Sequence, residues 1–140
     1  MSWDYPADLI VRAKRVYLIG NGGSYANAQH VCNDLLACGI KAYTLDSATL
    51  SAFANDYGWE SAFARWLNVV GEPGDLLIAF SGSGRSPNIL NAIVAAEHRG
   101  MDVFKFFGNE RHETMQAAEE AQVHLGHVIA SNLKVRLAIV

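Results

Sequence analysis

The residues best suited to chemistry are three serines set among glycines, in the stretch Ser81–Ser86 (SGSGRS), called the serine turn below. An apolar run of strand length, 76–80, precedes it. Ser86 is a good N-cap residue, and Pro87 suits the first position of the helical pattern that follows. Free N–H groups at a helix start, the helix dipole and glycines that permit close approach form an anion site, to which the serines add hydroxyls. The stretch predicts a phosphate site, with a plain strand-to-helix turn as the alternative; neither the P-loop spacing nor the dinucleotide fingerprint is present.

A second turn of small residues, Gly20–Ser24 (GNGGS), is called the glycine turn; it follows the short apolar stretch 16–19. A helix is predicted over 25–37, because apolar residues recur there at the spacing of one helix face. His30 and Asp34 lie four positions apart, opposite the apolar face. They are either a base or metal-ligand pair beside the turn, or a solvated surface pair. Two protein ligands are fewer than a zinc site normally uses.

Other polar residues also have two interpretations. Asp46 and Asp56 adjoin predicted strand ends or turns, and could either cap a helix or bind sugar hydroxyls. Arg85, inside the serine turn, could pair with an anion or face solvent. Four further histidines show no ligand spacing and are expected on the surface or in loops: His98, His112, His124 and His127.

The composition indicates a single domain, residues 1–140, that associates with other copies of itself. Hydrophobic residues make up 51% and charged residues 18%, so we expect part of the surface to be buried between the subunits of a homo-oligomer. The net charge of −3 and the lack of a Lys/Arg cluster argue against a nucleic-acid partner. No apolar run approaches about 18 residues and no signal-peptide pattern begins the chain, so we expect no membrane partner. Cys32 and Cys38 show no metal or redox spacing and are expected to be buried thiols in a reducing cytoplasm.

Strands and helices alternate along the chain, which indicates an α/β fold with a parallel sheet. Five strands are expected: 16–19, 40–45, 76–80, 103–107 and 123–125. Besides the helices that follow the two turns, we expect helices from Asp46 to Phe53, after Ser61, over 114–120 and after Ser131, with a turn over 55–58. With the strand order 2-1-3-4-5, both turns lie at the switch point between strands one and three, where ligands bind.

The segments 20–30 (GNGGSYANAQH), 53–59 (FANDYGW) and 74–88 (GDLLIAFSGSGRSPN) resemble the SIS (sugar isomerase) domain family, over nearly the whole chain. Within it, the chain is similar to the phosphoheptose isomerase branch, with the replication initiator-associating protein as a relative. The resemblance implies a flavodoxin-like three-layer sandwich, usually tetrameric. It also implies aldose–ketose isomerisation of sedoheptulose 7-phosphate for lipopolysaccharide synthesis. A non-catalytic phosphosugar-binding or adaptor module is the alternative.

The resemblance also assigns residues to a site. The positions that match the family's sugar and substrate contacts are Asn21, Gly22, Gly23, Ser24, Asn55 and Asp56. Those that match its phosphate loop are Ser81, Gly82, Ser83 and Ser86, with Gly82 where the family usually has threonine. His30 matches a metal-binding histidine. Asp34 stands where the family has a glutamate, one methylene longer, that is both ligand and catalytic acid/base.

The family's metal site also needs a glutamine and, eight residues later, a histidine on its last helix. The glutamine position is expected near Val135 and the histidine position beyond Val140, so two ligands of a zinc site are expected to be missing. Most of the family's long N-terminal helix is also absent. The chain is therefore expected to be one SIS domain shortened at both ends, with zinc as the candidate cofactor.

Overall fold

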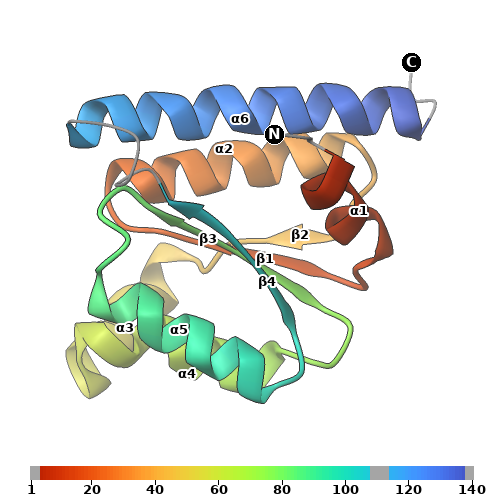
Figure 1. Ribbon diagram of the computed structural model, residues 1–140. Coiled ribbons are helices and arrows are strands. Elements are labelled where there is room, and N and C mark those ends of the chain that lie inside the picture. The colour runs from red at the N-terminus through yellow and green to blue at the C-terminus, as the bar shows by residue number, and fades with distance from the viewer. Residues whose placement is uncertain (1–3, 108–113, 138–140) are drawn as a thin grey trace.

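The computed structural model describes residues 4–107 and 114–137; His112 and Val140 lie outside these ranges. Its helical elements are α1 (Asp4–Arg12), α2 (Gly23–Ala37), α3 (Ser47–Tyr57), η1 (Trp59–Ser61), α4 (Ala62–Val70), α5 (Pro87–His98) and α6 (Met115–Arg136). One sheet lies between two helical layers, with α1, α2 and α6 on one face and α3, α4 and α5 on the other (Figure 1). Within the described ranges, no helix is both long and apolar enough to cross a membrane.

The sheet consists of β1 (Val16–Ile19), β2 (Ala42–Tyr43), β3 (Leu76–Ser81) and β4 (Asp102–Phe107), all parallel, in the order β2-β1-β3-β4. The predicted order of the first four strands is therefore confirmed, although β2 is shorter than expected. Since parallel strands place their carboxyl ends at one edge, the segments that follow β1 and β3 lie at the same edge.

Both faces of the sheet are covered, and β3 shows the consequence. Its alternate side chains Leu76, Ile78 and Phe80 join the core under α1, α2 and α6, whereas Leu77 and Ala79 join the core over α4 and α5. A strand buried on both faces reads as a continuous apolar run, and this run made β3 predictable.

The fifth strand, predicted over 123–125, is wrong. These residues lie inside α6, which also joins the two short helices expected over 114–120 and after Ser131 into one. The Thr114 side chain caps this helix by accepting a hydrogen bond from the Ala117 N–H at 3.1 Å. The buried positions of α6 follow helical spacing, but small and polar residues among them concealed the pattern: Ala118, Gln122, Gly126, Ile129, Ala130 and Leu133.

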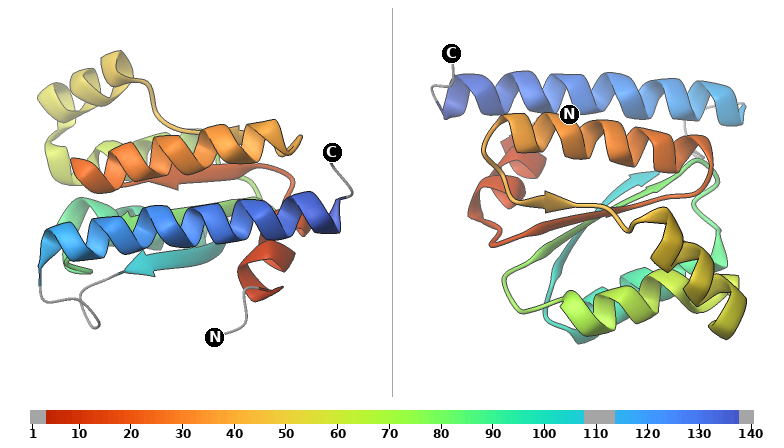
Figure 2. Two further views of the ribbon diagram at one scale, coloured as in Figure 1. Left: turned by 90° about the horizontal axis from the view of Figure 1, so that it is seen from above. Right: turned by 180° about the vertical axis from the view of Figure 1, so that it is seen from behind.

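The region after β2 also differs from expectation. α3 continues to Tyr57 and ends at Gly58, whose φ of 94° favours glycine, so the turn predicted over 55–58 is helical for most of its length. Asp46 caps α3, which is one of the two roles expected for it, and its carboxylate accepts a hydrogen bond from the Thr49 N–H at 2.9 Å. Ser61 does not cap α4; its hydroxyl donates instead to the backbone oxygens of Tyr57 and Gly58. Figure 2 shows α3 at the margin of the molecule, consistent with its having no buried residue.

Candidate functional site

The glycine turn and the serine turn lie side by side, because they follow the neighbouring parallel strands β1 and β3. A direct contact joins the glycine turn to the start of α5. The Asn21 Nδ2 donates to Asn88 Oδ1 at 2.9 Å, and the Asn88 Nδ2 donates to Asn21 Oδ1 at 2.8 Å. The expectation that both turns meet at the switch point of the sheet is therefore confirmed.

The serine turn is held by its own hydroxyls. Ser81 is 4% exposed, and its Oγ accepts from the Gly84 N–H at 2.9 Å. Ser83 Oγ accepts from the Arg85 N–H at 3.1 Å and lies 3.4 Å from Ser86 Oγ. Ser86 occupies the N-cap position of α5 without a side-chain cap hydrogen bond. A hydroxyl that accepts from the backbone can still donate its proton, so the turn offers hydroxyl donors beside a helix start.

Gly82 stands where the resemblance places threonine, and the structure supplies a reason. A Cβ at this position would lie 2.0 Å from the Met115 Sδ and 3.6 Å from the Ala118 Cβ, because the start of α6 covers the serine turn. Glycine therefore accommodates the methionine.

The glycine turn contacts α6 as well. A Cβ at Gly23 would lie 1.9 Å from the Glu119 Oε2, so this carboxylate occupies the space beside the start of α2. A carboxylate is favoured at a helix N-terminus. Gly22 has a φ of 53°, and Ser24, 3% exposed, donates its N–H to the Asn21 carbonyl oxygen at 2.9 Å. Glu119 was not anticipated from sequence.

His30, Asp34 and His127 bring their ligand atoms within 4.8 Å of one another. The His30 Nε2 lies 2.8 Å from the His127 Nε2 and 3.6 Å from the Asp34 Oδ2. That Asp34 oxygen is buried without a hydrogen-bond partner among the described residues. Two imidazole nitrogens and a carboxylate oxygen around one point form a typical metal-ligand set. His127 is exposed, as expected, and it joins this group although no ligand spacing marks it in the sequence.

Buried amides position α6 for this contact. The Asn27 Nδ2 donates to the Glu119 carbonyl oxygen at 2.8 Å and to Gln122 Oε1 at 2.9 Å, and the Gln122 Nε2 donates to the Phe106 carbonyl oxygen at 3.3 Å. Gly126 lets the helices approach closely, since a Cβ there would lie 2.5 Å from Val31 Cγ2. These contacts set the register of α6 along α2.

The positions of the family's glutamine and histidine ligands are expected from sequence near and beyond the end of the chain, but the structure shows candidates for both earlier on α6. Val135, near which the glutamine was sought, is 83% exposed towards the end of α6. The histidine that faces His30 is His127, and the residue eight positions before it is Glu119. The spacing that the resemblance implies is thus present earlier on α6, with glutamate in place of glutamine.

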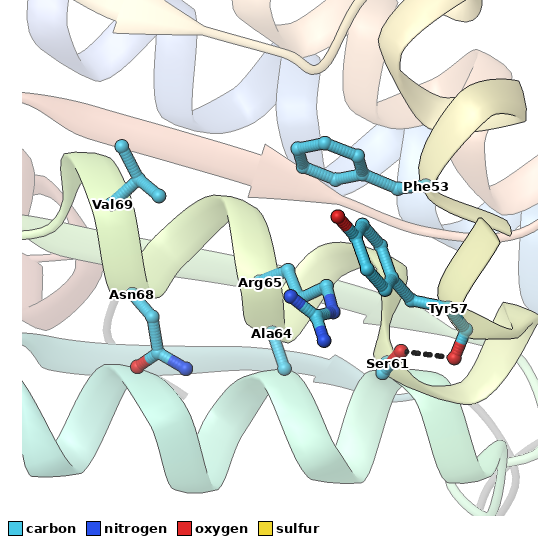
Figure 3. A pocket seen from close by; sticks show the side chains of 7 residues that line it. All are labelled: Phe53, Tyr57, Ser61, Ala64, Arg65, Asn68 and Val69. Atoms are coloured by element: carbon cyan, nitrogen blue, oxygen red, sulfur yellow. Dashed lines mark hydrogen bonds between the residues drawn. The ribbon is translucent and has the colours of Figure 1, made fainter.

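Asn55 and Asp56 are not joined to this arrangement by any hydrogen bond among the described residues. Both are exposed on α3, and the Asn55 Nδ2 donates to Asp56 Oδ1 at 3.0 Å. A hollow of about 520 Å³ lies between α3 and α4 (Figure 3). The Arg65 guanidinium lies over the Tyr57 ring there, 3.4 Å from its centre. The residues that line it belong neither to the two turns nor to the histidine cluster: Phe53, Tyr57, Ser61, Ala64, Arg65, Asn68 and Val69.

Burial and hydrogen bonding shift the titration of a few groups. Burial raises the pKa of the Tyr25 phenol, which lies directly after the glycine turn and donates to the Leu45 carbonyl oxygen, so it stays neutral. Burial likewise raises the pKa of the Cys32 thiol, one of the two buried free cysteines predicted from sequence. Hydrogen bonds at the start of α3, the Thr49 N–H first, lower the pKa of Asp46.

A parallel sheet of this order, with two small-residue turns at its switch point, defines a flavodoxin-like α/β protein whose turns lie where ligands bind in such folds. The sequence profile of the SIS domain matches residues 4–108, and the chain belongs to the SIS domain family.

Relatives and solved structures agree with this membership. The chain is 34% identical over 141 residues to the phosphoheptose isomerase of Burkholderia pseudomallei (strain 1710b), covering 89% of this chain and 72% of the relative. It is 37% identical over 119 residues to that of Aromatoleum aromaticum, covering 79% and 60%. The structure of phosphoheptose isomerase GmhA from Neisseria gonorrhoeae superposes with a TM-score of 0.88 at 25% identity, covering 95% of this chain and 85% of that one. A phosphoheptose isomerase from Francisella tularensis gives the same TM-score and identity.

Proposed function

We propose that this protein is an aldose–ketose isomerase of phosphorylated sugars that converts sedoheptulose 7-phosphate to a heptose 7-phosphate for lipopolysaccharide synthesis. The observation that carries the proposal is the pairing of the glycine turn with the start of α5, together with the cluster in which His30 and Asp34, on the helix that begins at the glycine turn, meet His127 of α6. His30 lies seven residues into α2, about 10 Å along its axis. The relatives are named phosphoheptose isomerases, which supports a heptose phosphate as the substrate.

The chemistry moves a proton between adjacent carbons through an enediol, which needs a base and a stabiliser of the developing oxyanion. Asp34 is the proposed base. Ser81, Ser83 and Ser86 bind the phosphate together with the start of α5, and this remote binding energy orients the sugar carbons at the base. Within the glycine turn, the residues that contact the sugar are Asn21, Gly22, Gly23 and Ser24.

His30, Asp34 and His127 fit a zinc ion. They supply two imidazole nitrogens and one carboxylate oxygen, as in catalytic zinc sites that keep an open position, and the buried Asp34 oxygen otherwise lacks a partner. Zinc held there would act as a Lewis acid towards oxygens of the sugar. With these residues as ligands, Glu119 is a second carboxylate near the glycine turn and an alternative base.

A phosphosugar-binding module without catalysis is the second candidate. Asp34 favours it, because its carboxylate is one methylene shorter than the glutamate of the family pattern. Asn55 and Asp56, two proposed substrate contacts, also favour it, since within the described part of the chain their side chains hydrogen-bond only to each other.

Turnover of sedoheptulose 7-phosphate by the purified protein, with and without added zinc, tests the proposal. We expect turnover by the wild type and its loss in Asp34→Ala. Asp102→Ala, which removes an exposed carboxylate from the other end of the sheet, serves as the matched control. Binding of the sugar phosphate without turnover in any zinc condition would favour the non-catalytic module instead.

We also propose that the protein forms a homo-oligomer, a dimer or a tetramer, in the cytoplasm. Val69 and Val135 are 76% and 83% exposed, and the helix α3 buries no residue within one copy of the chain. The two free cysteines are consistent with a reducing compartment. Light scattering coupled to size exclusion would measure the molar mass, and a monomer at micromolar concentration would contradict the assembly.

A further inference from the structure

The carboxamides of Asn21 and Asn88 form a closed pair between the glycine turn and the start of α5. Each donates one N–H to the oxygen of the other, at 2.9 and 2.8 Å. Asn88 is 2% exposed, and Asn21 is half-buried. The two residues are 67 positions apart, so the fold alone brings them together.

Each residue is also bound into the start of its own helix. The Asn21 carbonyl oxygen accepts from the N–H groups of Ser24 at 2.9 Å and Tyr25 at 3.3 Å, at the beginning of α2. Asn88 directly follows Pro87, the first residue of α5. The pair therefore ties together two helix N-termini, the places where backbone N–H groups meet an anion or a sugar oxygen.

The pair uses only part of what each carboxamide offers. A carboxamide carries two N–H donors and an oxygen that accepts twice, and the pairing uses one donor and one acceptor site on each residue. Asn21 therefore keeps one N–H for a ligand while its orientation is set by Asn88. A substrate that binds to both turns requires a constant distance between the two turns. A displacement of the bound substrate by about 1 Å reduces the reaction rate about 100-fold.

We propose that Asn88 is a positioning residue: through its pair with Asn21, it holds the glycine turn at the distance from the serine turn that lets one phosphorylated sugar contact both. The inference rests on the proposed function, since it requires a sugar phosphate at these turns. The serine turn keeps its hydroxyls and its helix start without the pair. Loss of the pair therefore affects the sugar part of the ligand and spares the phosphate part.

The experiment compares two ligands and two matched variants. Asn88→Leu has a similar size and cannot form the pair. Asn91→Leu makes the same change on the same helix at an exposed residue, whose Nδ2 donates to the Glu60 carbonyl oxygen. Calorimetry measures the affinity for inorganic phosphate and for sedoheptulose 7-phosphate, and steady-state kinetics gives kcat and KM.

For Asn88→Leu we expect phosphate affinity within about twofold of the wild type, and kcat/KM for the sugar phosphate lowered at least about tenfold. Asn91→Leu should match the wild type in both measurements. Circular dichroism checks folding, and Asn88→Ser provides a second variant if the leucine does not fit. Equal losses for both ligands would overturn the proposal, because they would show that Asn88 only supports the serine turn. Unchanged kcat/KM would overturn it as well.

A double-mutant cycle with Asn21→Leu separates positioning from independent contacts. If the pair acts as one unit, kcat/KM of the double variant is no lower than that of the more impaired single variant, because the second substitution removes no further interaction. The proposal would be overturned if the fold-loss in kcat/KM of the double variant equalled the product of the losses of the two single variants. A wild-type protein that binds neither ligand would refute the proposed function itself, and this result is recognisable because it needs no variant.

Discussion

The His127 Nε2 lies 2.8 Å from the His30 Nε2, although 97 positions separate the two residues in the chain. The contact joins the middle of α6 to the middle of α2, which lie side by side (Figure 1). Asp34, one turn after His30, adds a buried oxygen without a hydrogen-bond partner among the described residues. The contact converts a histidine–carboxylate pair into a three-ligand cluster.

Replacing His127 by alanine is expected to lower zinc affinity at least about 100-fold. Removing a residue that only hydrogen-bonds to a metal ligand already lowers metal affinity about 10–100-fold, and His127 is a proposed ligand itself. Competition with a chromogenic chelator measures the affinity. His124→Ala is the matched control, since it removes an exposed histidine of the same helix that is not part of this cluster. Equal zinc affinities of the wild type and His127→Ala would contradict the metal site.

Replacing Ser83 by alanine is expected to weaken the binding of a sugar phosphate about fivefold, the equivalent of ~1 kcal/mol for one neutral hydrogen bond. Calorimetry with sedoheptulose 7-phosphate checks this, and Ser131→Ala on the exposed side of α6 is the control. The phosphate site would be disproved by undiminished affinity in a variant that lacks the hydroxyls of Ser81, Ser83 and Ser86 together.

Two glycine-to-alanine changes should differ in cost. A Cβ at Gly20 would lie 2.8 Å from backbone atoms of Ser24, which cannot move without disturbing the glycine turn, so we expect Gly20→Ala to lower the unfolding free energy by about 1–3 kcal/mol. At Gly82 the obstacle is the Met115 thioether, which can rotate away, so Gly82→Ala should cost less than about 1 kcal/mol. Urea unfolding measures both, and a larger cost at Gly82 would contradict the predicted order.

The stabilising effect of the Asp46 cap should depend on pH. Hydrogen bonds from the Thr49 N–H and its neighbours lower the pKa of Asp46 in the folded protein, so the ionised form stabilises α3 above the ordinary pKa of the carboxyl group. This stabilisation is lost as the pH falls through the lowered pKa. We expect Asp46→Ala to be less stable than the wild type near pH 7, with the difference shrinking at acidic pH.

Urea unfolding near pH 7 and at acidic pH measures the difference in unfolding free energy between the wild type and Asp46→Ala. Asp46→Asn retains a capping oxygen but no titrating group, so its stability should lack this pH-dependent contribution. A difference between the wild type and Asp46→Ala that stays constant down to pH 3 would contradict the assignment.

The local sequence determined the parts of the site that each lie within one strand–turn–helix unit. The continuous apolar run of β3 and the glycines and serines after it predicted the serine turn, and the four-residue spacing of His30 and Asp34 predicted their contact. These features depend on backbone geometry over a few residues, which residue type and spacing largely decide.

Only the tertiary structure decided which distant residues complete the site. Gln122 and Gly126 look unremarkable in sequence, and helical spacing is hard to recognise where the first half of the buried stripe consists of alanine, glutamine and glycine. Packed against α2 and the end of β4, these residues set the register of α6 that brings His127 to His30 and Glu119 to Gly23. The register follows from side-chain packing and buried hydrogen bonds across some ninety positions of chain, whereas sequence patterns report only on near neighbours.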